Sequence, residues 1–237
     1  LYLSQQDMED LEISSLEMID SIEKLCLGRD EGWVHVAPKS SLKPDNNHFY
    51  MSTMAVAETP AFMEIKSLRL SDANAASGLE SIGSLIILSD ANTGHPIAIM
   101  DGDWITAYRT AALSALAARF LARGNSTVAA FIGCGVQARS HLDVLSDVYE
   151  LEKVYIFGRG KNNIGRLKKL AEGRNLEAVI TENASNAISN ADLIISTIPD
   201  NPRMRPFLDA KEVQPGNFTS MVDLARSWIP SSCLLYT

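Results

Sequence analysis

Apolar positions follow two different periods along the first half of this chain. In residues 1–26 they recur at mostly helical spacing, and Ser4 can cap the start, which predicts a helical opening. Residues 33–88 instead carry short β-rich runs separated by Pro, Asn, Asp and Gly, which is typical of an antiparallel sheet. A turn at Gly94 then predicts a hairpin over residues 89–102.

The second half opens with an alanine-rich helix, expected over residues 104–121, and continues with strands and helices in alternation. The strands are expected at residues 128–132, 153–157, 177–180, 192–196 and 218–222. This alternation predicts an α/β fold, with a Rossmann-type doubly wound parallel sheet after an N-terminal α+β domain. We place the domains at 1–116 and 117–237.

The carboxyl end is expected to be incomplete. The second half supplies five strands where the common dinucleotide fold has six, and residues 227–237 show no recognisable closing helix.

Composition narrows the classes of function. With 237 residues and 46% hydrophobic content the chain can bury a full core, whereas a net charge of −8 argues against nucleic-acid binding. No leader and no apolar run of bilayer length are visible, so we expect no membrane association. Cys26, Cys134 and Cys233 match no metal-ligand spacing, which predicts a cytoplasmic protein without a metal site.

Residues 131–142, "FIGCGVQARSHL", carry a phosphate-binding pattern between an apolar strand and a helix expected over 137–149. Gly133 permits the tight turn, Gly135 allows close approach of a pyrophosphate, and Ala138 allows the helix to pack against the strand. The turn predicts a dinucleotide site; the residues expected to contact the coenzyme also include Val136, Gln137, Ser196 and Thr197.

The end of the second strand favours NADP over NAD. An NAD site usually places a carboxylate here, but the sequence reads "FGRGKNN". Arg159 and Lys161 would suit a 2′-phosphate. The alternative, with NAD as coenzyme, is that Arg159 merely covers the adenine.

Arg109 is an unusual residue in the alanine-rich helix. Helical spacing places it on one stripe with Leu113, Leu116 and Phe120, so we expect it on the apolar face, near the positive end of the helix dipole. A cation there is unfavourable unless an anion binds it. We expect a ligand carboxylate, and the structural alternative is a pairing with Asp101 or Asp103. Alternation also places Lys66 beside Glu64 on one strand face, where a lysine is ordinarily exposed.

Residues 83–142 together resemble the ornithine cyclodeaminase and mu-crystallin family. The matching positions are Asp90, Thr93, Gly94, Pro96, Ala98, Asp101, Gly102, Ile105, Thr106, Arg109 and Gly133 to Ala138. The resemblance implies a homodimer of two-domain subunits, in which the N-terminal domain binds a small amino or imino acid and forms the dimer contact. It also implies that the Rossmann-type domain binds an NAD(P) coenzyme. It also implies that Arg109 binds the substrate carboxylate and that Lys66 is an active-site lysine.

Two departures from the family pattern matter. Lys39 follows Pro38 where the family often has arginine, so a point charge replaces a guanidinium fork. The G-x-D-x-P-G-K type segment of the cyclodeaminases is replaced by "GNFTSMVDLARSW", which leaves Asp223 as the nearest counterpart of the active-site aspartate. Ornithine chemistry is therefore disfavoured.

We accordingly expect an NAD(P)-dependent oxidoreductase that acts on the C–N bond of a small amino or imino acid. Arg109, with Lys39, would hold the carboxylate, Lys66 would donate a proton or hydrogen bond, and Asp223 would orient water or the substrate amine. Two alternatives remain: an ornithine or lysine cyclodeaminase, and a crystallin-like protein that binds NADPH without turnover. His35, His48, His95 and His141 are expected at the surface or in turns, with a packing role in the helix after the glycine turn as the alternative for His141. Cys134 is expected to contribute only its backbone to the glycine turn.

Overall fold

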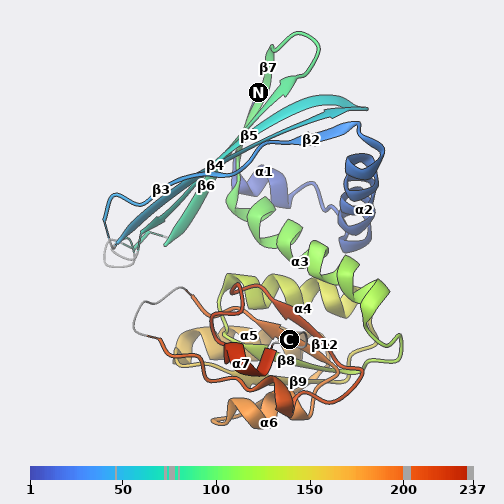
Figure 1. The fold of residues 1–237 in the computed structure, drawn as a ribbon, viewed down its shortest axis with the longest axis vertical. Helices are drawn as coiled ribbons and strands as arrows, with labels where there is room; N and C mark the ends of the chain where they lie inside the picture. The colour runs from blue at the N-terminus through green and yellow to red at the C-terminus, as the bar shows by residue number, and fades with distance from the viewer. Residues whose placement is uncertain (46, 72–73, 75–77, 80, 200–203, 234–237) are drawn as a thin grey trace. The chain divides into compact units, whose positions relative to one another are not determined.

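The structure is a computed structural model that describes residues 1–45, 47–71, 74, 78–79, 81–199 and 204–233. The chain forms two compact units, Leu1–Arg109 and Thr110–Thr237 (Figure 1). This structural boundary falls seven residues before the expected boundary at 116/117. The expected boundary separates a substrate-binding from a coenzyme-binding domain, and that division of roles remains a prediction. Both boundaries lie within one helix, α3 (Asp103–Leu121).

The N-terminal unit begins with a short helix and a longer one instead of the single expected helix. Ser4 caps α1 (Gln5–Glu9) as expected, but Ser14 caps a second helix, α2 (Ser15–Glu31). In both caps the serine hydroxyl accepts a hydrogen bond from the third helical N–H, and an acidic side chain there reaches back to the cap. The second capping box restarts the helix, which the apolar spacing alone did not reveal.

The expected antiparallel sheet is confirmed. Its strands are β1 (Tyr2–Leu3), β2 (Val34–Val36), β3 (Ser40–Leu42), β4 (His48–Glu58), β5 (Ala61–Ser71), β6 (Ile82–Asp90) and β7 (Pro96–Asp101). The order is β1-β7-β6-β5-β4-β2, with β3 also on β4, and only β1 pairs in parallel. The hairpin turn is closed by Asp90, whose Oδ1 accepts from the N–H and hydroxyl of Thr93.

The two faces of this sheet differ in exposure. Cross-strand pairing puts Lys66 opposite Ile86 on one face, and both are nearly buried, at 8% and 5% exposure. The other face carries Met54, Leu85 and Ile99, which are 40–45% exposed. Strand alternation therefore produces one packed face and one open apolar face.

Helix α3 presents a different face to the core from the one expected. Its buried face is lined with alanine and one leucine: Ala107, Ala111, Ala112, Ala115, Leu116 and Ala118. Leu113 and Phe120 are 45% and 71% exposed, and Arg109 is exposed as well. The expectation that Arg109 follows the buried apolar stripe is therefore wrong, because small alanines allow close packing and the larger apolar residues lie outside the contact.

The C-terminal unit confirms the Rossmann-type fold. Its parallel strands are β8 (Val128–Ile132), β9 (Lys153–Phe157), β10 (Glu177–Ile180), β11 (Leu193–Ser196) and β12 (Phe218–Met221), in the order β10-β9-β8-β11-β12. Its helices are α4 (Val136–Val148), α5 (Lys161–Gly173), α6 (Ala184–Ser189), the 3₁₀ helix η2 (Ala210–Glu212) and α7 (Pro230–Cys233). Figure 1 shows α4 and α6 on opposite sides of the sheet. The segment expected to lack a closing helix contains the short α7, and residues 234–237 lie outside the described residues.

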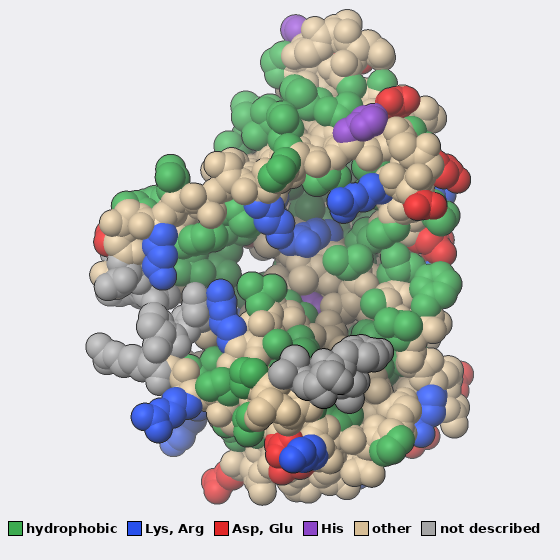
Figure 2. Space-filling model, viewed as in Figure 1, with side chains coloured by type: hydrophobic (Ala, Val, Ile, Leu, Met, Phe, Trp, Pro, Cys, Tyr) green, Lys and Arg blue, Asp and Glu red, His purple; other side chains and the backbone are tan. Residues whose placement is uncertain are grey.

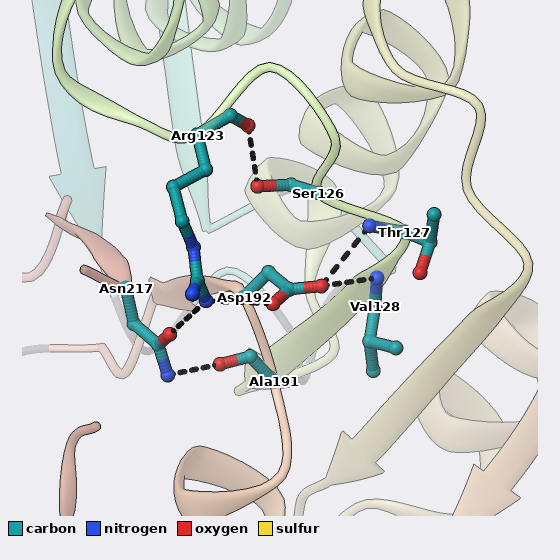
Figure 3. A network of polar contacts seen from close by, with 7 residues as sticks. All are labelled: Arg123, Ser126, Thr127, Val128, Ala191, Asp192 and Asn217. Carbon is teal, nitrogen blue, oxygen red and sulfur yellow. Dashed lines mark hydrogen bonds and ion pairs between the residues drawn. The ribbon is translucent and has the colours of Figure 1, made fainter. Parts of the chain in front are cut away.

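A polar network joins the amino ends of three strands in this unit (Figure 3). The Arg123 guanidinium donates to Asp192 at 3.0 Å and to Asn217 at 2.8 Å. The other oxygen of Asp192 accepts from the backbone N–H groups of Thr127 and Val128. These contacts satisfy backbone groups where β8 begins, and they leave the carboxyl ends of the strands, where such sheets bind ligands, unobstructed by this network.

Candidate functional site

Lys66 is the centre of a charged cluster in the N-terminal unit. It lies mid-strand in β5, opposite Thr53 of β4, and is buried, contrary to the ordinary expectation for a strand lysine. Burial, followed by the positive charge of Arg109, lowers the pKa of Lys66 to about 8, while Glu64 and Asp103 oppose that shift and Lys39 adds to it. The structure thus brings Lys39, Lys66 and Arg109 into one electrostatic neighbourhood. In the space-filling view of Figure 2, several Lys and Arg side chains are visible on the surface of the N-terminal unit.

The start of α3 is fixed to β6 by a set of short polar contacts. The backbone N–H and the hydroxyl of Ser84 donate to Asp103 Oδ1 at 2.6 and 3.1 Å. The Thr106 hydroxyl donates to the Gly102 carbonyl, and a Cβ at Gly102 would lie only 2.6 Å from Ser84 Oγ. Arg109 begins the next turn, so this anchor determines where its guanidinium can reach.

The structural alternative for Arg109 is not observed. Asp103 accepts from Ser84, and Asp101 accepts from the backbone N–H of Asp103 at 2.8 Å. Within the part of the chain that the structure describes, Arg109 itself makes no hydrogen bond or ion pair. Desolvation by the surrounding protein lowers the pKa of Arg109, and the negative charge of Glu64 opposes this shift. The guanidinium nevertheless remains charged near neutral pH. The arrangement leaves a cation available to a carboxylate.

Glu64 belongs to this cluster, although no role for it was expected from the sequence. It lies two residues before Lys66 on the same strand face and is half-buried. Burial raises the pKa of Glu64, and the charges of Lys66 and Arg109 oppose the increase. Strand alternation, which placed Glu64 beside Lys66, was the signal that could have identified it.

The glycine turn in the C-terminal unit has the geometry that a pyrophosphate requires. Gly133 has φ of +101°, and a Cβ there would lie 2.8 Å from Thr197 Oγ1. A Cβ at Gly135 would meet nothing within 4 Å, which leaves open space at the start of α4. Gly135 is the N-cap of this helix and offers no side-chain cap, while Ala138 is fully buried against the sheet. The strand, turn and helix therefore fit a dinucleotide phosphate.

Thr197 and Ser196 end β11 beside this turn but differ in their surroundings. Thr197 Oγ1 is buried and has no hydrogen-bond partner among the described residues, so a ligand group could satisfy it. The Ser196 hydroxyl donates to Asp223 at 2.9 Å and accepts from the Trp228 indole N–H at 3.0 Å. Ser196 therefore belongs to an internal network, whereas Thr197 is the better placed of the two for a coenzyme.

Asp223 is tied into that same network. It is 5% exposed; one carboxylate oxygen accepts from Ser196 and the other from the Ser227 hydroxyl at 2.5 Å. Within the C-terminal unit, the structure thus joins Asp223 to the end of β11. Its predicted contact with substrate remains a prediction, and its geometry favours a positioning role.

The remaining expected coenzyme contacts lie at both sides of the turn. Val136 and Gln137 open α4. Arg159 and Lys161 are exposed where β9 ends and α5 begins, and no carboxylate lies between Phe157 and Lys161. Burial raises the pKa of Cys134 to about 11, which suits the expectation of a turn residue without thiol chemistry.

His141 departs from the surface or turn position expected for the histidines and follows the alternative of a packing role within its helix. It is fully buried in α4, and burial lowers its pKa to about 4. Its Nδ1 donates to the Gln137 carbonyl at 2.6 Å, so the neutral ring accepts at Nε2 from the Ser114 hydroxyl, 2.9 Å away. Ser220 of β12 lies 2.8 Å from that hydroxyl. Helix periodicity could have identified His141 as buried.

Among the described residues no three His, Cys, Asp or Glu side chains are grouped so that they could hold a metal ion. None of the helices formed by the described residues has the length and apolarity needed to span a bilayer.

Comparison with known proteins gives consistent matches. The model of the ornithine cyclodeaminase/mu-crystallin family matches residues 1–225. An alanine dehydrogenase of Archaeoglobus fulgidus is 28% identical over 222 residues, which are 94% of this chain and 66% of that protein. The structure of Thermococcus litoralis Δ1-pyrroline-2-carboxylate reductase with NADH and L-proline has a TM-score of 0.86 at 30% identity, covering 92% of this chain and 67% of the other.

A second solved structure, an archaeal alanine dehydrogenase dimer with bound NAD, has a TM-score of 0.83 at 29% identity, covering 92% of this chain and 66% of that one. The chain therefore spans about two thirds of the length of these proteins.

Proposed function

Because this chain belongs to the ornithine cyclodeaminase/mu-crystallin family, we propose that it is an NAD(P)-dependent oxidoreductase acting on the C–N bond of a small amino or imino acid. The observation that carries the proposal is the cluster of Lys66 and Arg109, a buried lysine beside a guanidinium that no described carboxylate pairs. Placing unpaired positive charges this close together reduces the stability of the folded protein, and a bound anionic ligand would offset that loss.

The N-terminal unit would bind the acid. Arg109 takes the α-carboxylate, for which its planar fork is suited, and Lys39 adds a positive charge nearby. Lys66, with its pKa near 8, donates a proton or hydrogen bond at the imine nitrogen at neutral pH. Burial of the Lys66 ammonium makes this proton easier to release than that of an exposed lysine.

The C-terminal unit would bind the coenzyme, which supplies the hydride when bound. Gly133 and Gly135 shape the turn, the first turn of α4 from Val136 to Ala138 faces the pyrophosphate, and Thr197 offers its hydroxyl. Asp223 acts through Ser196 by holding the end of β11 in place.

We propose NADPH as the preferred coenzyme, although the two similar solved structures carry NADH and NAD. Arg159 and Lys161 are exposed at the position where an NAD site would place a carboxylate, and both can pair with a 2′-phosphate. Replacing Arg159 by Gln should weaken NADPH binding about tenfold and leave NADH binding nearly unchanged.

We also propose a homodimer formed through the open apolar face of the antiparallel sheet. Met54, Leu85 and Ile99 lie on that face at 40–45% exposure, and a self-complementary contact between two copies would bury them. Cytoplasmic location is part of the proposal as well, because all three cysteines are free thiols, as expected in a reducing compartment.

The test is NADPH oxidation with a panel of cyclic imines and of 2-oxo acids supplied with ammonia or methylamine. Stoichiometric oxidation of NADPH with at least one of these substrates supports the proposal. Conversion of ornithine or lysine without net coenzyme consumption would instead identify a cyclodeaminase. Tight NADPH binding without oxidation by any substrate would identify a binding protein.

A further inference from the structure

Glu64 introduces a negative charge into the cluster of Lys39, Lys66 and Arg109. On strand β5 it precedes Lys66 by two residues on the same face, which separates the two Cα atoms by about 7 Å. It is half-buried and makes no hydrogen bond or ion pair with the other described residues. Its charge nevertheless interacts with both Lys66 and Arg109.

The charges of the cluster determine which acids it can accept. Without Glu64, the three cations would be opposed only by Asp103, which is held by Ser84 at the start of α3, and their excess positive charge would suit a ligand that carries two carboxylates. Arg109 is assigned to the α-carboxylate, so a second carboxylate would have to bind near Lys66 or Lys39, and Lys66 shares its strand face with Glu64. Like charges that meet on one partly desolvated face repel each other. A neutral or cationic side chain meets no such repulsion.

We propose that Glu64 is a specificity-determining residue, which makes this protein select monocarboxylate amino or imino acids with a neutral or cationic side chain and reject those with a second carboxylate. The inference rests on the proposed function, since it assumes that the cluster binds the substrate. It concerns the charge of the side chain and is separate from the question of whether turnover occurs.

The experiment compares two acids of equal chain length, 2-oxopentanoate and 2-oxoglutarate. Their binding to the NADPH-saturated protein is measured by titration calorimetry, and their reductive amination with ammonia is measured in parallel. The wild-type protein should bind 2-oxopentanoate at least tenfold more tightly. Glu64→Gln, which keeps the shape and removes the charge, should reduce this preference at least fivefold, mainly by improving binding of 2-oxoglutarate.

Two control variants separate charge from folding. Glu64→Asp retains the negative charge and should retain the preference. Glu58→Gln removes an exposed carboxylate at the end of β4 that pairs with His35, and should leave the preference unchanged. Similar thermal melting of all variants verifies that they fold alike.

The outcomes distinguish the two proposals. An unchanged preference in Glu64→Gln, equal or tighter wild-type binding of 2-oxoglutarate, or no binding of either acid would overturn the inference. If the acids bind with the expected preference but neither is aminated, the inference stands and the proposed oxidoreductase function fails. If both are aminated with the same preference in Glu64→Gln, the function stands and the inference falls.

Discussion

Asp103 and Ser84 are joined by two hydrogen bonds that hold the first turn of α3 against β6. Asp103 Oδ1 accepts from both the backbone N–H, at 2.6 Å, and the hydroxyl, at 3.1 Å. This pair explains why Asp103 is not the partner of Arg109, since its carboxylate oxygen already serves as the anchor of the helix. The position of Arg109 in the cluster therefore depends on the Asp103–Ser84 contact, in which neither Lys39, Lys66 nor Arg109 takes part.

Replacing Asp103 by Ala should reduce the free energy of unfolding of the N-terminal unit by about 1–3 kcal/mol, because it leaves the Ser84 N–H without its carboxylate. Urea denaturation followed by tryptophan fluorescence, to which Trp33, Trp104 and Trp228 all contribute, measures this loss. Asp30→Ala, at an exposed site near the end of α2, is the control and should change stability by less than about 0.5 kcal/mol. Equal effects of the two variants would contradict the assigned anchor.

Replacing Arg109 by Lys should raise KM for the 2-oxo acid about tenfold or more, because an ammonium cannot pair with a carboxylate through a planar fork. Replacing it by Gln should raise KM further, whereas the affinity for NADPH should not change. Steady-state kinetics and coenzyme titration measure the two quantities. Arg29→Gln, in the last turn of α2, is the matched control. A wild-type KM in Arg109→Gln would remove the carboxylate-binding role.

Loss of the Lys66 proton should reduce kcat/KM at alkaline pH. Its pKa is about 8 in the folded protein, so the protonated donor is lost as the pH rises through 8, and kcat/KM should fall about tenfold per pH unit above that value. A profile of kcat/KM from pH 6 to 10 tests this, and activity that rises through pH 8 would contradict it. Lys66→Met should lose most of the activity, and its remaining activity should no longer fall above pH 8.

The same lowered pKa has a consequence for stability. Protonated Lys66 is disfavoured in the folded state, so it costs stability at all pH values below 8, and the cost disappears as the pH approaches the unfolded value near 10.5. Lys66→Met should therefore raise the Tm at pH 7, with a gain that shrinks toward pH 10. A Tm difference independent of pH would show that the ammonium is not desolvated.

Two glycines of the turn should respond differently to alanine. At Gly133 the new Cβ would lie 2.8 Å from Thr197 Oγ1 at a positive φ, so Gly133→Ala should lower both Tm and NADPH affinity. At Gly135 the Cβ meets open space, so Gly135→Ala should keep the wild-type Tm while binding NADPH at least tenfold more weakly. Gly165→Ala in α5 is the control for both measurements, and unchanged NADPH binding in Gly135→Ala would refute the pyrophosphate assignment.

His141 should make the C-terminal unit sensitive to acid. The neutral ring is favoured in the folded state, with a pKa of about 4 against an ordinary value near 6.5. Its contribution is fully present above pH 6.5 and is lost as the pH falls toward 4. His141→Gln should therefore flatten the dependence of Tm on pH between 6.5 and 4, whereas His95→Gln, at an exposed turn, should not. Parallel slopes in wild type and His141→Gln would contradict this.

The sequence by itself determined the elements and the fold of this protein. Apolar runs bounded by Gly, Pro and polar residues fix strands locally, which is why β8, β9 and β10 begin and end as expected and why the glycine turn could be placed between β8 and α4. It also indicated Arg109, because a cation on an apolar helix stripe contradicts the surrounding pattern, whereas Lys66 was indicated by the family resemblance alone.

Only the tertiary structure decided how those residues are surrounded. The alanine face of α3 packs inward because close contact favours small residues, so Arg109 lies on the exposed side of the helix. Whether Asp103 contacts Ser84 or Arg109, and whether Lys66 is buried beside Glu64, depends on contacts between segments far apart in the chain. Burial and long-range electrostatics are properties of the assembled fold, and local periodicity does not encode them.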